Sequence, residues 1–267
     1  MNTNDFLTPD IEVTINNRAR RGDVVRMRVD AERVPGAASL ASISLVLANQ
    51  NGQWQTTPAV ADRDVITVKW GWRGETLTPL FDGTVHQATT REVVLLNALD
   101  RCRSLVDTRV TRTYRHLESV NIVRDLVAPL GFASLSLADA RQQLVRLPLC
   151  NDTVADAIRH LDAGLEITLS AWADQTGNFH WDAPDIAQAS VATITEAEEV
   201  ESLTQPCSHL YRLVLARALP SLWHSQVVTL RTRDGQSLSL YIDGISHWYD
   251  ADHGARTTIR ACEVAYV

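Results

Sequence analysis

The sequence predicts a mainly β protein with an α+β insertion, built from two similar tube-like β-barrel modules and a smaller middle region that contains helices. Three observations lead to this prediction. Short strand-like runs fill both ends of the chain, the apolar residues adopt a helical period in its middle, and the two ends carry similar strands. We place the first module at residues 1–105, the α+β middle region with two helices and a β-hairpin at 106–200, and the second module at 201–267. The barrels are expected to be able to exchange strands with the middle region.

Alternating or β-branched runs indicate strands in the first hundred residues. These runs are Ile11–Ile15, Val24–Val29, Ser42–Asn49, Val65–Gly71, Leu80–Ala88 and Glu92–Leu99. Asn51-Gly52 predicts a turn after the third run, and a loop with Gly74 separates the fourth from the fifth. Short strands at this spacing are typical of a small barrel or sandwich.

The middle of the chain has the apolar spacing of helices. Residues from Val120 to Leu130 place their apolar side chains on one helical face, which Ser119 could cap and Gly131 could end. Pro129 should loosen the last turn.

A second helix is predicted at Thr153–Ala163, with Asn151 or Asp152 as its cap and Gly164 at its end. A β-hairpin follows, with strands at 165–172 and 179–181 and its turn at Gly177.

The rest of the chain is an acidic stretch followed by strands. Residues 182–210 contain no Lys or Arg, and we interpret them as a solvated connector. The predicted strands are Leu210–Arg217, Val227–Thr232, Ser237–Tyr249 and Ala255–Val264, with a turn at Asp234-Gly235.

The first and last thirds of the chain resemble each other. Val65–Lys69 matches Val227–Arg231, Phe81-Asp82-Gly83 matches Ile242-Asp243-Gly244, and His86 matches His247. A duplication would place the two matching strands at corresponding positions in the two barrels. Val65, Thr67 and Lys69 would then point to one face, and Val227, Thr229 and Arg231 to the corresponding face. Three chains with two such modules each would give six modules.

Composition excludes several classes of protein. Of the 267 residues, 45% are hydrophobic and 21% charged, so the chain can bury a core and is not generally disordered. No apolar run approaches the roughly 18 residues of a membrane helix, and the first residues lack a secretory signal, so no membrane insertion by this chain is predicted. The net charge of −7, with Lys69 as the sole Lys, disfavours tight non-specific DNA binding but is compatible with DNA that passes nearby. The four isolated cysteines are predicted to be buried free thiols.

The stretch from Val65 to Leu105 resembles the first barrel of phage tail hub proteins. This family includes late control protein D, the baseplate hub of contractile tails, and the hub portion of type VI secretion spike proteins. The matching motifs are Asp64-Val65, Leu80-Phe81-Asp82-Gly83-Thr84-Val85 and Leu99-Asp100. HLESVNIVRDLVAPLGF and LPLCNDTVADAIRHLDAGLEITLSAWADQTGNFHW resemble the family's helical elements, and SLSLYIDGISHWYDADHGARTTI resembles the end of its second barrel. The order of the motifs carries the resemblance, which covers most of the chain from Val65 onward. The chain is short for the family, and Trp72 and Trp248 stand where smaller residues are expected.

The resemblance implies a structural tail hub that is not an enzyme and holds no cofactor. Such a hub is a homotrimeric ring with pseudo-sixfold symmetry that joins the tail tube to the spike or tail tip and lets DNA pass. The implied partners are the tail tube protein, a spike or tail-tip protein and a tape measure protein. The implied location is the baseplate or tip of the virion tail, after synthesis in the host cytoplasm. Edge strands would then be joined across subunits, which removes exposed sheet edges.

No catalytic, cofactor or metal site is predicted, because the motifs of serine hydrolases, zinc proteases and nucleotide-binding loops are absent. HWYDADH at 247–253 is interpreted as a polar hairpin tip rather than a metal site. His160 and Asp162 are interpreted as a solvated helix end, and Asp62 and Asp64 as a turn.

Two alternatives to a structural hub stay open. A tail-associated cell-wall hydrolase could use Glu196, Glu198 and Glu199, and a receptor- or carbohydrate-binding baseplate protein could use exposed tryptophans. The tryptophans in question are Trp54, Trp72 and Trp223. Two arginine clusters are interpreted as inter-subunit ion pairs rather than a nucleic-acid patch. They consist of Arg18, Arg20, Arg21, Arg26 and Arg28, and of Arg101, Arg103, Arg109, Arg112 and Arg115.

Overall fold

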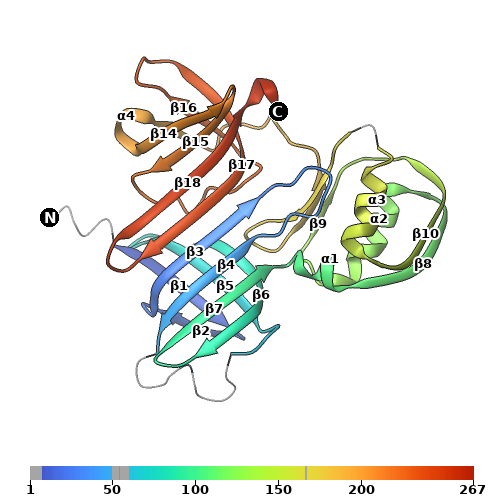
Figure 1. Cartoon of the computed structure of the whole chain (residues 1–267), viewed down its shortest axis with the longest axis horizontal. Coiled ribbons are helices and arrows are strands. Elements are labelled where there is room, and N and C mark those ends of the chain that lie inside the picture. Colours follow the sequence, from blue (N-terminus) through green and yellow to red (C-terminus); the bar gives the residue numbers. More distant parts are fainter. Residues whose placement is uncertain (1–7, 50–53, 55–59, 166) are drawn as a thin grey trace.

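The computed structural model describes residues 8–49, 54, 60–165 and 167–267. Figure 1 shows a large β body formed by the two ends of the chain and a smaller lobe, formed by the middle of the chain, that projects to one side. The predicted class, mainly β with a helix-containing middle region, is confirmed. The turn predicted at Asn51-Gly52 lies outside the described residues.

The β body is one 13-stranded sheet. Its N-terminal strands are β1 (Pro9–Ile15), β2 (Arg18–Arg21), β3 (Val24–Glu32), β4 (Ser42–Ala48), β5 (Val65–Trp72), β6 (Thr78–Thr90) and β7 (Val93–Asp100). Its C-terminal elements are β13 (Ala192–Thr195), α4 (Glu196–Glu199), β14 (Val200–Cys207), β15 (Leu210–Leu215), β16 (Val227–Arg231), β17 (Ser237–Asp250), β18 (Gly254–Glu263) and the 3-10 helix η4 (Val264–Tyr266). The closure of either half into a barrel, and the predicted module boundaries, stay predictions.

The two halves of the sheet repeat the same strand order. Neighbouring strands run β3-β4-β7-β6-β5-β1 in the N-terminal half and β14-β15-β18-β17-β16-β13 in the C-terminal half, which is the same permutation of chain order. Every neighbouring pair is antiparallel except β13–β16, which is parallel where β1–β5 is antiparallel. We call these two sets of strands module 1 and module 2.

Backbone irregularities recur at corresponding positions in the two modules. In the strand pairs β3–β4 and β14–β15, the residue that follows a buried valine has no partner on the neighbouring strand. This residue is Val25 in β3 and Glu201 in β14. In the long hairpin of each module the unpaired residue is His86 in β6 and Asp243 in β17. A β-bulge leaves one extra residue unpaired in this way. The shared bulges therefore align the modules independently of side-chain identity, while further irregularities occur in one module only, between Val68 and Lys69 of β5 and between Thr204 and Cys207 of β14.

This alignment confirms one part of the sequence match and corrects another. Val65 lies opposite Thr84 and Val227 lies opposite Tyr241, so the matched strands β5 and β16 occupy corresponding positions, as predicted. The predicted match of the two Asp-Gly pairs is wrong by four residues, because the bulges align Asp243 with His86 and not with Asp82. His86 and His247 therefore do not correspond either.

The exposure of the two matched strands follows the predicted alternation. Ile66 and Val68 of β5 are buried, as are Val228 and Leu230 of β16. The residues between them face the other side of the sheet. At that side the two strands differ at their first residue, since Val65 is 42% exposed and Val227 only 4%.

The two modules are joined along β3 and β17. Seven residue pairs connect these strands in antiparallel register, from Gly244 opposite Glu32 to Asp250 opposite Arg26. A single apolar core extends through both modules and includes Met27 and Trp70 of module 1 and Leu230 of module 2. The body is therefore one packed unit.

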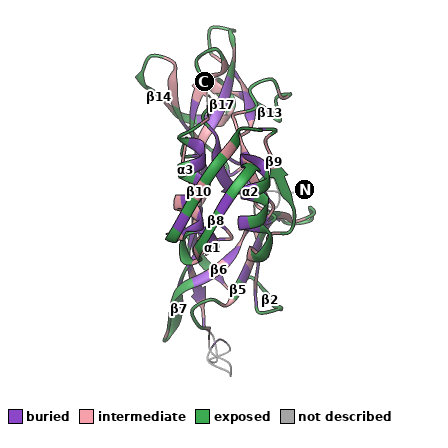
Figure 2. Cartoon of the chain, turned by 90° about the vertical axis from the view of Figure 1, so that its right-hand side faces the viewer, coloured by how far each residue is buried: buried purple, intermediate pink, exposed green. Residues whose placement is uncertain are grey.

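The lobe has its own apolar core. Its elements are α1 (Arg103–Asp107), β8 (Arg109–Glu118), α2 (Ser119–Val127), the 3-10 helix η3 (Ala128–Leu130), β9 (Leu135–Leu137), β10 (Gln143–Thr153), α3 (Val154–Asp162), β11 (Ser170–Ala173) and β12 (Phe179–Asp182). Figure 2 views the chain from the lobe side and shows the antiparallel β8–β10 ribbon in front, with mostly exposed residues. Helices α2 and α3 bury Ile122, Val123 and Ile158 behind it.

Both predicted helices are present, with different caps. Ser119 is the first residue of α2, and its hydroxyl donates to the carbonyl of Ala140 instead of capping the helix. Thr153, and neither Asn151 nor Asp152, caps α3 by accepting the Asp156 N–H at 3.0 Å. The last turn at Pro129 is a 3-10 helix, and it ends at Gly131 with φ of 77°, as the sequence predicted.

Candidate functional site

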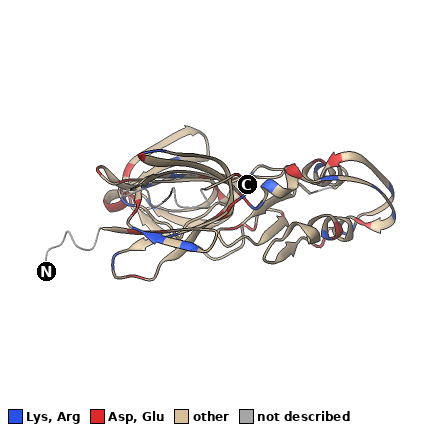
Figure 3. Ribbon diagram, turned by 90° about the horizontal axis from the view of Figure 1, so that it is seen from below, with Lys and Arg blue, Asp and Glu red and all other residues tan. Residues whose placement is uncertain are grey.

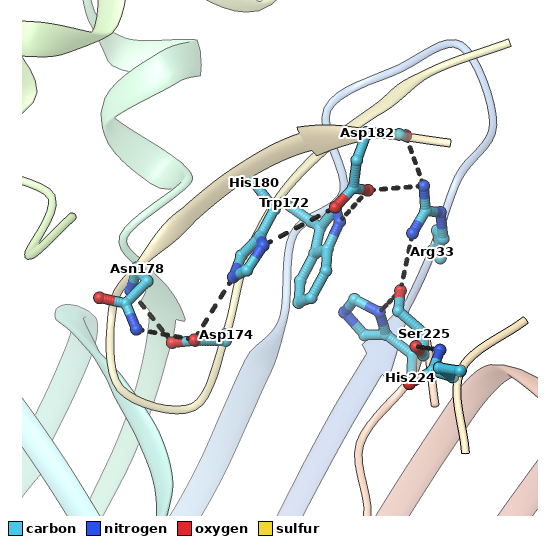
Figure 4. A network of polar contacts seen from close by, with 9 residues as sticks. Arg33, Trp172, Asp174, Asn178, His180, Asp182, His224 and Ser225 are labelled. Atoms are coloured by element: carbon cyan, nitrogen blue, oxygen red, sulfur yellow. Dashed lines mark hydrogen bonds and ion pairs between the residues drawn. The ribbon is translucent and has the colours of Figure 1, made fainter. Parts of the chain in front are cut away.

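A buried polar cluster lies where the lobe meets both modules (Figure 4). Module 1 contributes Arg33 from the loop after β3, and the lobe contributes Trp172, His180 and Asp182 from the β11–β12 hairpin. Module 2 contributes His224 and Ser225 from the loop before β16. We call these six residues the polar junction.

Arg33 connects the three regions. Its Nη2 donates to the Asp182 carboxylate at 2.8 Å and to the Asp182 carbonyl oxygen at 2.5 Å, while Nη1 donates to the Ser225 hydroxyl at 3.0 Å. The Arg33 residue is only 4% exposed, so these bonds replace part of its hydration, while its Nε is buried without a hydrogen-bond partner among the described residues. Because a buried charge is costly without partners, Asp182 and Ser225 hold the guanidinium in place.

His180 lies in the lobe between two carboxylates. Its Nε2 is 3.4 Å from Asp174 and its Nδ1 is 3.7 Å from Asp182, and its ring stacks on Trp172 with centroids 4.0 Å apart. Burial would lower the pKa of His180, but the two aspartates outweigh burial and raise its pKa to about 9. Burial would raise the pKa of Asp182, but His180, Trp172 and Arg33 hold it below the ordinary value. At neutral pH the junction thus contains two cations, Arg33 and His180, and one anion, Asp182, and the Asp174 carboxylate lies beside His180.

His224 is the neutral member of the junction. The residue is 2% exposed, and burial together with the charges of Arg33 and His180 lowers its pKa to about 3. Its Nδ1 lies 2.9 Å from the Ser225 hydroxyl, a spacing that also occurs between a nucleophile and its base. Here Arg33 already donates to that hydroxyl, and both the histidine and the arginine are buried. The arrangement therefore ties the three segments together.

The predicted polar hairpin tip at 247–253 is correct only for residues 251–253, which form the turn, whereas His247 to Asp250 belong to β17. His247 is fully buried, with Nδ1 2.9 Å from the Thr257 hydroxyl and Nε2 3.0 Å from the carbonyl oxygen of Leu222. Asp250 binds Arg26 at 2.9 Å and His253 at 3.0 Å. Among the described residues, no group of three or more His, Cys, Asp or Glu side chains could hold a metal ion.

Two of the three glutamates that a hydrolase could use form hydrogen bonds within the chain. Glu196 accepts the backbone N–H of Arg233 at 3.1 Å, and Glu199 accepts from Thr195 at 2.8 Å and from Arg217 at 2.9 Å. Glu198 is exposed beside them on α4. These bonds connect α4 to neighbouring strands. The prediction of a solvated connector at 182–210 is therefore wrong, because this stretch contains β13, α4 and β14 and buries Ile194 and Val200.

The other carboxylates have structural contacts as well. Asp62 binds Arg103 at 3.1 Å, and Asp64 accepts the N–H of Ala61 at 2.8 Å in the predicted turn. Asp162 was predicted to be solvated but is buried. Burial raises its pKa to about 6, although it accepts the Trp181 indole N–H at 2.8 Å.

Most of the clustered arginines form ion pairs within the chain, and Figure 3 shows basic and acidic positions interspersed along the ribbon. Their partners within the chain include Glu12 for Arg21, Asp250 for Arg26, Asp30 for Arg28, Asp82 for Arg101, Asp62 and Asp107 for Arg103, and Asp125 for Arg112. Arg109 donates to the carbonyl oxygen of Asn151 at 2.7 Å. Because carboxylates of the same chain already bind these arginines, fewer of them are available for the predicted ion pairs between subunits.

Two predictions about single residue types need correction. The four cysteines are free, but only Cys102 is buried, while Cys150 and Cys207 are exposed because β10 and β14 have exposed faces. Trp54 and Trp223 are buried and Trp72 packs against the core, so these tryptophans do not form an exposed sugar-binding surface.

Sequence reasoning missed the polar junction. Arg33 and Asp182 are separated by 149 residues, and each stands alone beside a strand end with no local motif.

None of the helices in the described residues is long and apolar enough to cross a membrane.

The comparisons with known proteins concern the fold. No protein-family model and no curated protein matches the sequence. Among solved structures, a tail protein from Neisseria meningitidis matches with a TM-score of 0.72 at 13% identity, covering 96% of each chain. The 43 kDa tail protein of prophage MuSo2 from Shewanella oneidensis matches with a TM-score of 0.70 at 11% identity, covering 96% of this chain and 98% of that one.

A third similar structure comes from a secretion system. It is an Escherichia coli component of the type VI secretion system with structural similarity to bacteriophage T4 tail proteins. It matches with a TM-score of 0.65 at 12% identity, covering 94% of this chain and 76% of that chain. The chain thus has the fold of phage tail proteins, and the resemblance inferred from the sequence is confirmed at the level of the fold.

Proposed function

We propose that the chain is a structural phage tail protein whose three copies form a hub ring at the baseplate or tail tip. The observation that carries this proposal is the repetition of one strand order, with the same two bulges, in modules 1 and 2. Two similar modules per chain give six modules in a trimer. Such a ring matches a sixfold tube on one side and a threefold spike or tip on the other.

The polar junction has a clear role in such a ring. It fixes the lobe against both modules through Arg33, whose partners lie in the other two regions. A rigid lobe presents its outer β8–β10 ribbon at a constant position, three times around the ring. We propose that the lobes and the ring faces contact the neighbouring tail proteins, namely the tube, the spike or tip protein and the tape measure protein.

The charge of the chain fits the passage of DNA. With 25 basic and 32 acidic residues the protein does not attract phosphate as a whole. Affinity for DNA depends largely on neutralising phosphates, so a ring of this composition lets DNA slide rather than holding it.

The oligomeric state tests the proposal directly. Native mass spectrometry of the purified protein should show a species of three times 29.6 kDa. Electron microscopy of that species should show six similar modules around a channel, with three lobes outside. A protein that stays monomeric at high concentration, and is present once per tail particle, contradicts the proposal.

We also propose that the protein has no enzymatic activity. Incubation with purified peptidoglycan should release no soluble fragments. Release that is abolished by Glu198→Gln but unaffected by Asp139→Asn, an exposed carboxylate on the lobe, would show that the acidic segment is catalytic.

A further inference from the structure

We infer that the ring closes by strand addition between copies: the C-terminal part of β14 in one copy pairs, antiparallel, with the outer edge of the C-terminal part of β6 in the next copy. The inference rests on the proposed ring and names the surfaces that form it. The partner of each surface is a second copy of this chain.

The contact between β3 and β17 within one chain is the template. The long strand β17 pairs with β16 through its first residues and with β18 through most of its length. Its remaining edge, Gly244 to Asp250, is covered by β3, the first strand of module 1. Module 1 therefore meets module 2 through one strand of each.

The corresponding edges on the far sides of the two modules have no strand beside them in the described part of the chain. In module 1, β6 pairs with β5 only up to Thr84, while it pairs with β7 to Thr90. In module 2, β14 pairs with β15 on one side only. These two edges correspond to β17 and β3, so they are the two that a module-to-module contact of the same kind requires.

Exposed sheet edges offer unpaired N–H and C=O groups that invite another strand. A contact that pairs unlike surfaces of two copies is head-to-tail, and it forms a closed ring when the rotation between copies closes. One interaction, used within each chain and again between chains, would then join all six modules.

The shared bulges, together with a further irregularity between Thr204 and Cys207 of β14 that β3 lacks, predict the register of the new contact. Within the chain, Arg28 of β3 lies opposite Trp248 of β17. The residue that corresponds to Arg28 is Thr204 of β14, and the residue that corresponds to Trp248 is Arg91. We therefore expect Thr204 of one copy to lie opposite Arg91 of the next. Glu201 near the start of β14 lies at this end too, where it binds Arg256 of its own chain at 3.0 Å.

A second pair of equivalent positions fixes the other end of the contact. Asp30 pairs with Ser42 in β4 and with Ser246 in β17. Cys207, which pairs with Leu210 in β15, occupies the position in β14 that corresponds to Asp30. Thr89 occupies the position in β6 that corresponds to Ser246. We therefore expect Cys207 of one copy to lie opposite Thr89 of the next.

This register allows a test with a thiol already present in the chain. Cys207 and Thr89 are both exposed in the single chain. Directly opposite residues in an antiparallel pair have Cα atoms about 4.5 to 5.5 Å apart, within the range that a disulfide spans. The variant Thr89→Cys should therefore form a disulfide with Cys207 of the neighbouring copy.

The experiment oxidises Thr89→Cys mildly and analyses it by electrophoresis without reductant. Most chains should shift from the 29.6 kDa band to covalent dimers and trimers, and the closed trimer should contain three disulfides. The double variant Thr89→Cys/Cys207→Ser should lose these bands. Ser237→Cys, which places an exposed thiol at the start of β17 away from both edges, should not produce them.

Native mass and amide exchange separate the two levels of the proposal. A trimer without the disulfide, in which the amides of residues 87–90 exchange as fast as in the monomer, overturns the strand addition and leaves the ring intact. A protein that is monomeric at every concentration overturns both. A trimer with slowed exchange at residues 87–90 and the disulfide supports both.

Discussion

Replacing Arg33 with methionine should unfold the protein at a clearly lower temperature, because it removes the shared partner of the polar junction. Methionine keeps much of the volume of the arginine stem but none of its donors. Asp182 then loses the charge that compensates it, and the Ser225 hydroxyl loses a donor at 3.0 Å. The lobe would also lose one of its ion pairs with the N-terminal part of the body.

The expected cost follows from the burial of the pair. Removing one member of a buried ion pair costs about 3 to 5 kcal/mol. The Asp182 side chain retains 31% exposure and a hydrogen bond from the Trp172 indole at 3.0 Å, which places Arg33→Met near the lower end, about 3 kcal/mol. For a chain of this size, that corresponds to a decrease of roughly 6 to 12 °C in Tm.

Urea and thermal unfolding followed by circular dichroism measure this difference. Arg28→Met, on the strand β3 that precedes Arg33, is the matched control. Its ion pair with Asp30 joins side chains that are 63% and 43% exposed, and such pairs contribute less than about 1 kcal/mol. In a double-mutant cycle, Arg33→Met and Asp182→Asn should be non-additive. A loss for Arg33→Met no larger than that of the control, or simple additivity, would refute the reasoning.

Three further predictions concern titration, backbone space and thiol access. Burial lowers the pKa of His247 to about 4, so as pH falls below about 6.5 this residue binds a proton in the unfolded chain before it does so in the folded one. The free energy of unfolding should therefore drop by about 1.4 kcal/mol per pH unit because of this residue. The variant His247→Gln should flatten that slope in urea unfolding between pH about 6.5 and about 4. Gly83→Ala would place a Cβ 2.1 Å from the Leu99 carbonyl oxygen, so calorimetry should show a cost of about 3 kcal/mol. The matched control Gly22→Ala, which meets nothing within 4 Å but has φ of +78°, should lose only about 1 kcal/mol, and equal losses would contradict this explanation. A maleimide should label exposed Cys150 at once and buried Cys102 only after unfolding, whereas equal rates in the folded protein would show that the core around Cys102 opens readily.

The strands of the two modules could be predicted because their burial follows the period of a strand. In β4 and β7 the buried and less buried residues alternate along the whole strand, so the amino-acid pattern reports the structure directly. Strands β8 and β10 have no such signal, because most of their residues are exposed and only isolated ones, such as Tyr114 and Leu149, are buried. Periodicity detects a buried face, and this ribbon has almost none.

The caps and the register failed for a related reason. Ser119 and Thr153 both stand beside plausible alternatives, and only the path of the chain decides which side chain meets a free N–H. The Asp-Gly match was a local coincidence, whereas the true alignment is recorded in backbone bulges at His86 and Asp243 that leave no mark in residue type. The polar junction depends on contacts between residues far apart in the chain, which no local pattern encodes.

The pairing of β3 with β17 also determines the order in which the protein can be completed during translation. Arg26 and Asp250, which close one end of this contact, are 224 residues apart. Chains emerge from the ribosome N-terminus first, so β3 is finished long before its partner strand exists. Throughout that interval its edge can capture a strand from another nascent chain on the same messenger. The pace of elongation between these two strands, and any chaperone that covers β3 meanwhile, therefore decides how much of the protein folds alone rather than swapped with a neighbour.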